Sequence, residues 1–250
     1  TTFPIPDAVD GEVGGGQVAR ILYAVRPGQT AYWSDRLERF RIPTETQTVM
    51  GQEQLTFADP TGLQMGMLET ELGPDNGWSF AGVSGDQQII GIHAATLVSQ
   101  KPEITLEVLT KHLGYALVSE DEDYYQLKIH DDLGGLLYLQ KEAAKRGRVG
   151  KGTVHHIAFT IKDDEIDAWQ SYLTEAGLLP TTIRERKYFR SIYFRERGGI
   201  LIELATEGPG VLIDEELDHL GERFQVPPDF ADEEERIRAE VMPLEVREVE

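Results

Sequence analysis

One pattern occurs three times along the chain, and this repetition restricts the possible folds more than any other feature of the sequence. Each copy begins with a β-branched, apolar stretch typical of a strand, continues into a helical pattern, and ends with further strand-like stretches. Residues 18–25 align with residues 154–161, and the match continues through the helix and two later strands. A third copy begins at 89–98. A match of this length indicates an internal repeat of βαβββ modules.

The repeat predicts an α+β fold in which tandem βαβββ modules form two half-barrel domains. Residues 1–6 resemble the end of a strand and do not begin with Met, so we expect a first module that is missing or truncated in this sequence. The predicted segments are the end of that module with a linker (1–16), a second module (17–70), a linker (71–88), a third module (89–142), a linker (143–152), a fourth module (153–210) and a C-terminal extension (211–250).

The composition is that of a water-soluble globular protein and excludes some partners. The 250 residues are 40% hydrophobic, contain no cysteine and carry a formal net charge of -20. This charge argues against nucleic acid and anionic membranes as partners, and no apolar run is long enough to span a bilayer. Disulfides and thiolate chemistry are excluded by the absence of cysteine. With no signal-peptide pattern at the start, we expect a cytoplasmic protein.

A single carboxylate is the most informative residue of the fourth copy. Glu203 lies between Ile202 and Leu204 in a strand-like stretch, and a carboxylate there is costly unless it is paired or binds a metal. The first strand of the same copy carries the doublet His155 and His156. Imidazole and carboxylate groups on neighbouring strands are candidate metal ligands.

The other two copies lack this combination. In the second copy, Arg20 takes the place of His156, and Gly66 takes the place of Glu203. In the third copy, His93 takes the place of the histidine, but Leu139 is predicted at the position of the carboxylate. We therefore expect these two copies to keep the fold without the complete ligand set.

The repeat, the His155-His156-Ile-Ala-Phe strand and the Gly198-Gly-x-x-x-Glu203 strand resemble the vicinal oxygen chelate superfamily, which includes glyoxalases, bleomycin resistance proteins and dioxygenases. Residues 188–196 and 205–210 are similar to the ring-cleaving dioxygenases of hydroquinone type. The resemblance covers essentially the whole chain, and its most specific part is residues 153–210.

This resemblance implies chemistry at a divalent metal. Two imidazoles and one carboxylate on one face of the ion are typical of non-haem Fe(II) oxygenases, and the resemblance makes His156 and Glu203 two of these ligands. It places Tyr193 as a hydrogen-bond donor to the substrate oxygen, while His155 and Arg186 would orient the ligand or hold the anionic substrate. The expected cofactor is Fe(II), with Mn, Zn or Ni as alternatives, and the expected partners are a small aromatic substrate and O2. A homo-oligomer is left open.

The third ligand has two candidate sources. In the hydroquinone group it comes from the first strand of the first module, which this sequence lacks. His93 is the other strand-start histidine, and its alternative role is that of a half-buried strand residue. Catechol-type enzymes carry a histidine in the window that residues 184–186 occupy here, and its absence favours the hydroquinone type.

Three classes of function are therefore compatible with the sequence. The first is Fe(II)-dependent extradiol-type cleavage of a hydroquinone or catechol ring. The second is a glyoxalase-type isomerase or thiol transferase that uses a metal on the same fold. The third is a metal-free or truncated protein that binds without catalysis.

Overall fold

The computed structural model describes residues 7–75, 79 and 81–241. The expected strand end at 1–6 and the acidic tail at 242–250 lie outside these residues. Contacts divide the chain into two compact units, each described by itself below. The first holds the residues up to Ile157 together with Glu196–Leu201, and the second holds Ala158–Arg195 and the residues from Ile202 onward.

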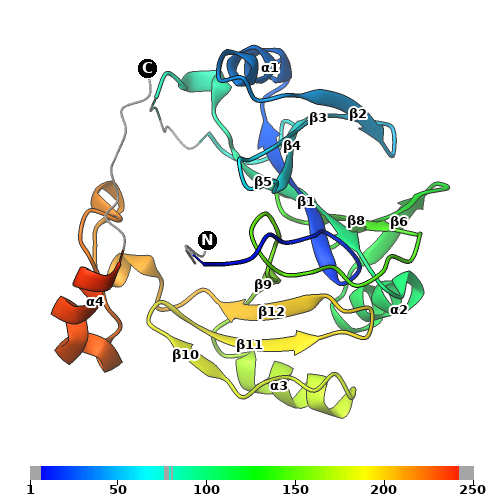
Figure 1. The fold of residues 1–250 in the computed structure, drawn as a ribbon. Coiled ribbons are helices and arrows are strands. Elements are labelled where there is room, and N and C mark those ends of the chain that lie inside the picture. The colour runs from blue at the N-terminus through cyan, green and yellow to red at the C-terminus, as the bar shows by residue number, and fades with distance from the viewer. Residues whose placement is uncertain (1–6, 76–78, 80, 242–250) are drawn as a thin grey trace. The chain divides into compact units, whose positions relative to one another are not determined.

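The first unit contains a curved sheet of eight strands in the order β2-β3-β4-β1-β5-β8-β7-β6 (Figure 1). The second and third repeat copies meet at its centre, where β1 and β5 pair antiparallel. The strands are β1 (Gln17–Val25), β2 (Glu45–Val49), β3 (Gln52–Ala58), β4 (Gln64–Glu69), β5 (Gly91–Val98), β6 (Ala116–Glu120), β7 (Tyr124–Lys128) and β8 (Leu136–Gln140).

Each copy in this unit has one helix, and each helix packs on the sheet through an apolar face. Helix α1 (Thr30–Arg39) buries Trp33 and Leu37 against a cluster that includes Val25 and Met67. Helix α2 (Pro102–Glu107) begins at a proline, which suits the first turn because proline lacks the N–H that would have no partner there. It continues as a π-helical turn, Val108–His112.

The pairing of β1 with β5 shows how the two copies are related. Arg20 lies opposite Thr96, and Leu22 lies opposite Ala94. A two-fold relation between these strands therefore equates Arg20 with Ala94. His93 falls at a register shift just beyond Leu22 and is the extra residue of a β-bulge. The prediction that Arg20 and His93 occupy equivalent points was wrong by one residue, because the bulge adds a residue that sequence alignment does not reveal.

The same register corrects the position predicted for Leu139. Strand β1 pairs in parallel with β4, and Leu22 faces Gly66. Strand β5 pairs in parallel with β8, and Thr96 faces Tyr138. Since Leu22 and Thr96 are equivalent, the residue that corresponds to Gly66 is Tyr138 and not Leu139. The third copy thus has a fully buried aromatic side chain at the position aligned with the carboxylate of the fourth copy.

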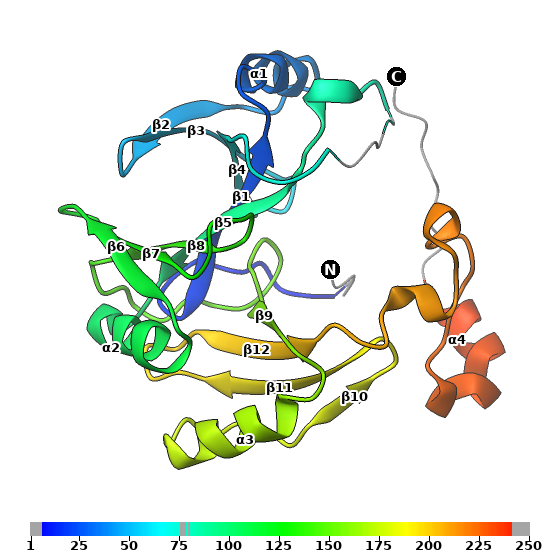
Figure 2. The ribbon, with the colours of Figure 1, turned by 180° about the vertical axis from the view of Figure 1, so that it is seen from behind.

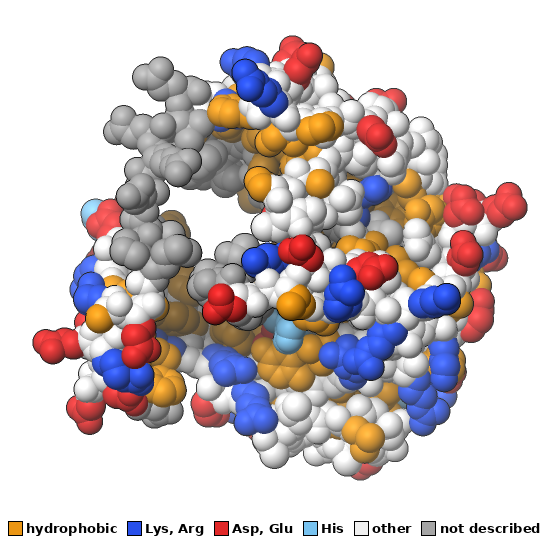
Figure 3. Space-filling view, viewed as in Figure 1, with side chains coloured by type: hydrophobic (Ala, Val, Ile, Leu, Met, Phe, Trp, Pro, Cys, Tyr) orange, Lys and Arg blue, Asp and Glu red, His pale blue; other side chains and the backbone are white. Residues whose placement is uncertain are grey.

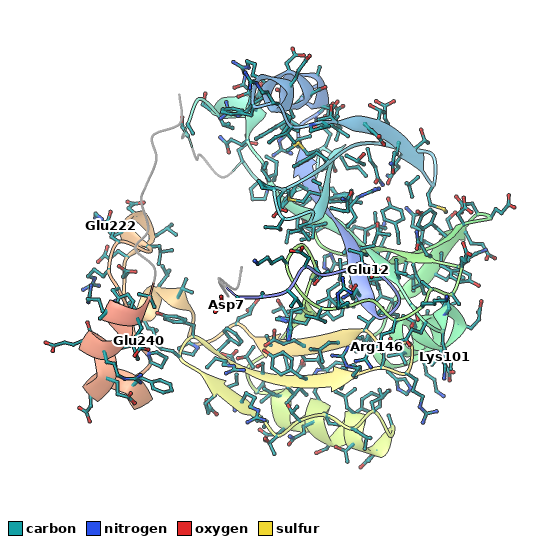
Figure 4. The ribbon with its side chains drawn as sticks, viewed as in Figure 1. Asp7, Glu12, Lys101, Arg146, Glu222 and Glu240 are labelled. Atoms are coloured by element: carbon teal, nitrogen blue, oxygen red, sulfur yellow. The ribbon has the colours of Figure 1, made fainter. Side chains whose placement is uncertain are left out.

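The glycine-rich segment 11–16, predicted to be a flexible connection, instead runs beside the linker 144–151. Isolated β-bridges join Asp10 to Lys151 and Glu12 to Arg148, and Figure 4 marks the two segments by Glu12 and Arg146. A Cβ on Gly15 would lie 2.4 Å from the carbonyl oxygen of Ala144. Glycine is required at this position because the two backbones approach too closely for a side chain.

The second unit contains a four-stranded sheet in the order β10-β11-β12-β9, with helix α3 on one face (Figures 1 and 2). Ile166 and Leu173 of α3 are fully buried, as the helical pattern predicted. The elements are β9 (Ile157–Ile161), α3 (Ile166–Glu175), β10 (Arg184–Arg186), β11 (Phe189–Arg195) and β12 (Leu201–Thr206).

Two local predictions for this part of the chain were wrong. The first strand was expected to begin at residue 154, but β9 begins at Ile157, so the histidine doublet precedes the strand. The short helix expected at 214–220 is replaced by two 3-10 turns, Val211–Ile213 and Leu217–His219. The last helical pattern was placed correctly, since a 3-10 segment (Pro228–Glu233) leads into α4 (Glu234–Glu240).

The surface carries both signs of charge. On the face drawn in Figure 3, acidic and basic side chains are interspersed. The net negative charge is therefore not gathered into one patch on that face. Among the described residues, no helix has the length and apolar composition needed to cross a bilayer.

Candidate metal and substrate site

Glu203 occupies the middle of β12, and its side chain is only 3% exposed. Its neighbours Ile202 and Leu204 are buried as well, so the strand is covered on both faces. The Tyr193 hydroxyl donates a hydrogen bond to Oε1 of Glu203. The prediction that this carboxylate needs a polar partner is thus met in part by a phenol from the neighbouring strand β11.

Tyr193 is held in place by hydrogen bonds to its backbone as well as by its hydroxyl. Its N–H donates to Oγ1 of Thr181 at 3.1 Å, and its carbonyl accepts from the Thr181 N–H at 2.8 Å. The sequence analysis missed Thr181, although its place just after Pro180 and opposite β11 is a signal for such a clamp. Burial, followed by the hydrogen bond to Glu203, raises the pKa of Tyr193. The hydroxyl therefore keeps its proton and acts as a donor at neutral pH.

Arg186 comes to the same face of the sheet as Tyr193. In the pairing of β10 with β11, Arg186 lies opposite Phe189, and Arg184 lies opposite Ser191. Paired residues share a face, and side chains two residues apart on a strand do so too. Phe189, Ser191 and Tyr193 therefore point the same way as Arg186, as predicted for a hairpin turn near residue 188. The side chain of Arg186 hydrogen-bonds Tyr193, which acts to lower the tyrosine pKa.

The two histidines that precede β9 contact each other. Nδ1 of His155 lies 2.9 Å from Nδ1 of His156, and the rings meet edge to face with centroids 5.2 Å apart. One of these nitrogens must donate and the other accept. A metal-binding imidazole commonly donates its second ring N–H to a neighbouring acceptor, which fixes the tautomer and ring orientation. The contact is consistent with an orienting role for His155.

The predicted ligands fall in different compact units. His156 belongs to the first unit and Glu203 to the second, and each is described within its own unit. In the part of the chain that the structure describes, no three His, Cys, Asp or Glu side chains form a group that could hold a metal ion. The chemistry of the donor set nevertheless suits a divalent ion, since a buried carboxylate and an imidazole with an oriented ring are both ligands of Fe, Mn or Zn.

His93, the alternative third ligand, lies in the first unit. It is 6% exposed, and its Nδ1 has no hydrogen-bond partner among the described residues. Burial lowers the pKa of its imidazole. The position equivalent to Gly66 in its copy is filled by Tyr138, whose hydroxyl donates to Gln52. His93 therefore has no carboxylate at the strand position where the fourth copy has Glu203.

Comparison with known proteins identifies the family. The model of the Glyoxalase/Bleomycin resistance protein/Dioxygenase superfamily matches residues 91–204. The protein named "Putative ring-cleaving dioxygenase MhqO" of Bacillus subtilis (strain 168) is 38% identical over 251 residues, covering 100% of this chain and 80% of that protein. The chain belongs to this superfamily. The resemblance stated from the sequence, and the curved-sheet α+β fold that it implied, are confirmed.

Other relatives of this superfamily member carry similar names. "Chlorohydroquinone/hydroquinone 1,2-dioxygenase" of Sphingobium indicum is 28% identical over 241 residues, covering 91% of this chain and 74% of that protein. A crystal structure described as a "putative dioxygenase from Bacillus subtilis" has a TM-score of 0.95 and 38% identity, with coverage of 98% of this chain and 80% of that one. The chain thus groups with the ring-cleaving dioxygenases of the superfamily, as the sequence predicted.

Proposed function

We propose that this protein is a metal-dependent, extradiol-type dioxygenase that cleaves the ring of a hydroquinone or catechol. The observation that carries the proposal is the buried Glu203, held by the Tyr193 hydroxyl in the middle of an apolar strand. A buried carboxylate with a single phenol donor remains costly. A cation at this carboxylate would offset that cost. The ring-cleaving dioxygenases among its relatives support the reaction class.

In this proposal, His156 and Glu203 hold the metal, with Fe(II) as the first candidate. A histidine outside the described residues supplies the third ligand, and His93 is the alternative source. A divalent ion held in this way supplies Lewis acidity toward a ring oxygen and, when it is redox-active, electron transfer to dioxygen. The edge-to-face contact between His155 and His156 orients the ligating ring.

Tyr193 and Arg186 are the residues that act on the substrate. The Tyr193 hydroxyl is a proton donor because burial and Glu203 raise its pKa, so it can hydrogen-bond the oxygen of a bound phenol. The Arg186 guanidinium on the same face favours the ionised form of that phenol, since a nearby positive charge lowers the pKa of an acid. Together these groups stabilise an anionic ring, the form that donates electron density most readily.

Metal analysis of variants tests the assignment. The protein, expressed with any residues that precede Thr1 in its gene, is loaded anaerobically with Fe(II), desalted and analysed for iron. We expect His156→Ala and Glu203→Ala each to lose the metal and to keep the circular dichroism spectrum of the parent. Glu175→Ala, at an exposed carboxylate on α3, is the matched control and should retain iron. Stoichiometric iron in both site variants would show that the ligand assignment is wrong.

Oxygen uptake tests the reaction itself. The iron-loaded protein should consume O2 with hydroquinone or with catechol, and the product should show the absorbance of a ring-opened compound. Stoichiometric iron without oxygen uptake on either substrate would refute the dioxygenase proposal while leaving the metal site intact. The glyoxalase-type and metal-free alternatives would then be the ones to pursue.

A further inference from the structure

The first unit contains a pocket that the proposed dioxygenase chemistry does not use. Its volume is about 290 Å³, near the lower end of the range typical of small-molecule sites. It is formed by residues of β3 to β8 and the adjoining loops of both repeat copies in this unit. The lining residues are Gln52, Leu68, Glu69, Thr70, Leu72, His93, Val118, Gln126, Lys128, His130, Asp131 and Leu136.

His93 is the side chain that makes this pocket more than a surface hollow. It is the extra residue of the bulge in β5, and bulges commonly re-aim a side chain near a functional site. The imidazole lines the pocket, is 94% buried by difference from its 6% exposure, and leaves Nδ1 without a partner among the described residues. Buried polar groups in native proteins are nearly always hydrogen-bonded. An unsatisfied imidazole on a pocket wall therefore indicates a ligand group that completes it.

The charged groups of the lining already have partners. Lys128 and Asp131 form an ion pair with each other. Oε1 of Glu69 accepts hydrogen bonds from the N–H and the hydroxyl of Thr30, at 3.0 and 2.6 Å. No uncompensated charge thus remains in the described lining to hold an ionic ligand. The net charge of -20 also disfavours an anion.

The deeper wall offers neutral polar groups among aliphatic ones. Leu68 and His93 are its buried members, and burial keeps the imidazole neutral by lowering its pKa. Gln52, which accepts the Tyr138 hydroxyl, and Gln126 add amide groups. Such a wall suits a small neutral molecule with hydroxyl or carbonyl groups on an apolar ring. The volume fits one substituted six-membered ring and is too small for a nucleotide-sized ligand.

The geometry points to a second binding site in the first unit, in which His93 hydrogen-bonds a neutral, hydroxyl- or carbonyl-bearing ring compound. The site goes beyond the proposed catalytic centre, because it uses the second and third repeat copies and none of the proposed ligands or substrate-binding residues. In these copies Gly66 and Tyr138 occupy the strand positions aligned with Glu203, so the pocket binds its ligand without a carboxylate from those positions.

Nitrogen NMR of the histidine side chains tests the site with hydroquinone as the probe. The protein is labelled with 15N-histidine, kept metal-free with a chelator, held anaerobic and given the Glu203→Gln substitution, so that binding at the proposed catalytic centre does not contribute. We expect the His93 ring resonances to shift and saturate with a dissociation constant on the order of 1 mM, as for other ligands of this size. His93→Leu should weaken binding of hydroquinone by about tenfold, the effect of losing one hydrogen bond.

Two neighbouring residues on the edge strand β6 provide a control that does not touch the buried histidine. Val118 lines the pocket and is exposed, whereas Leu117 is exposed but not part of the lining. Val118→Trp should block the pocket and abolish the saturable shift, and Leu117→Trp should leave it unchanged. The inference is overturned if the His93 resonances do not shift, or if Val118→Trp binds hydroquinone as well as Leu117→Trp does. Because the test needs neither metal nor turnover, its outcome is independent of the dioxygenase proposal.

Discussion

Replacing Tyr193 with phenylalanine should weaken metal binding as well as turnover. The resemblance alone gave this tyrosine a role toward the substrate oxygen. The structure places its hydroxyl on Oε1 of Glu203, so the same group also orients a proposed metal ligand. Phenylalanine keeps the ring and the packing, and the two backbone hydrogen bonds to Thr181 are unaffected. The variant therefore removes one donor to a buried carboxylate and little else.

The size of the effect follows from this contact. A hydrogen bond to a charged group contributes about 1.5 to 3 kcal/mol, and about 1.4 kcal/mol corresponds to a factor of ten in a binding constant. We therefore expect metal affinity to fall by about tenfold to a hundredfold, the range found when partners of metal ligands are removed. Turnover of hydroquinone by the fully loaded variant should fall by about tenfold to a thousandfold, because a proton donor is lost as well.

Competition with a chelator measures the affinity, and an oxygen electrode measures turnover at saturating iron. Tyr188→Phe is the matched control, since the Tyr188 hydroxyl also donates to a carboxylate, Oδ2 of Asp214 at 2.8 Å, in the same unit. The control should leave metal affinity within about twofold of the parent, a change of less than 0.5 kcal/mol. If Tyr193→Phe binds metal as tightly as this control, the hydroxyl does not support the ligand. If turnover is also unchanged, the site is misassigned.

Two further predictions concern stability and can be checked by urea denaturation followed by circular dichroism. Glu196 is buried and accepts hydrogen bonds from Gly198 N–H, Ile200 N–H and the Thr105 hydroxyl, so Glu196→Gln should lower the free energy of unfolding by about 1 to 3 kcal/mol because an amide donor then faces a backbone donor. Thr105→Val, which removes only one donor, should cost less, and equal stability of Glu196→Gln and the parent would contradict the reasoning. Burial lowers the His93 pKa, so below the unfolded pKa of about 6.5 the unfolded chain binds more protons at this residue, and stability should fall as the pH is lowered toward the folded pKa. His93→Gln should be less sensitive to pH than the parent between pH 7.5 and 5.5, and an unchanged pH dependence would argue against the buried, neutral imidazole.

The repeat and the order of elements could be read from the sequence because they depend on local periodicity. Strand alternation and helical spacing are properties of neighbouring residues, and they located α1, α3 and most of the strands. Glu203 could be singled out for the same reason, since a carboxylate between two apolar strand residues is conspicuous without any knowledge of its surroundings. The resemblance added the metal, the reaction class and the named ligands, which no periodicity contains.

The details that decide the chemistry depend on contacts between distant segments. The bulge at His93 is visible only when β5 is paired with β1, and it moved the equivalence of the repeat copies by one residue. The Tyr193 hydroxyl reaches Glu203 because β11 and β12 belong to one sheet. The glycine-rich segment 11–16 proved to be bridged to residues 144–151 because glycines permit close backbone approach as readily as flexibility.

The sequence by itself determined which segments form strands and helices, that the modules repeat, and that only the fourth copy combines a strand-start histidine with a strand carboxylate. Tertiary structure alone decided which side chain fills each equivalent position and which polar group satisfies another. The physical reason is that secondary structure follows from the preferences of adjacent residues. A register, a bulge or a buried hydrogen bond instead depends on how two strands far apart in the chain meet.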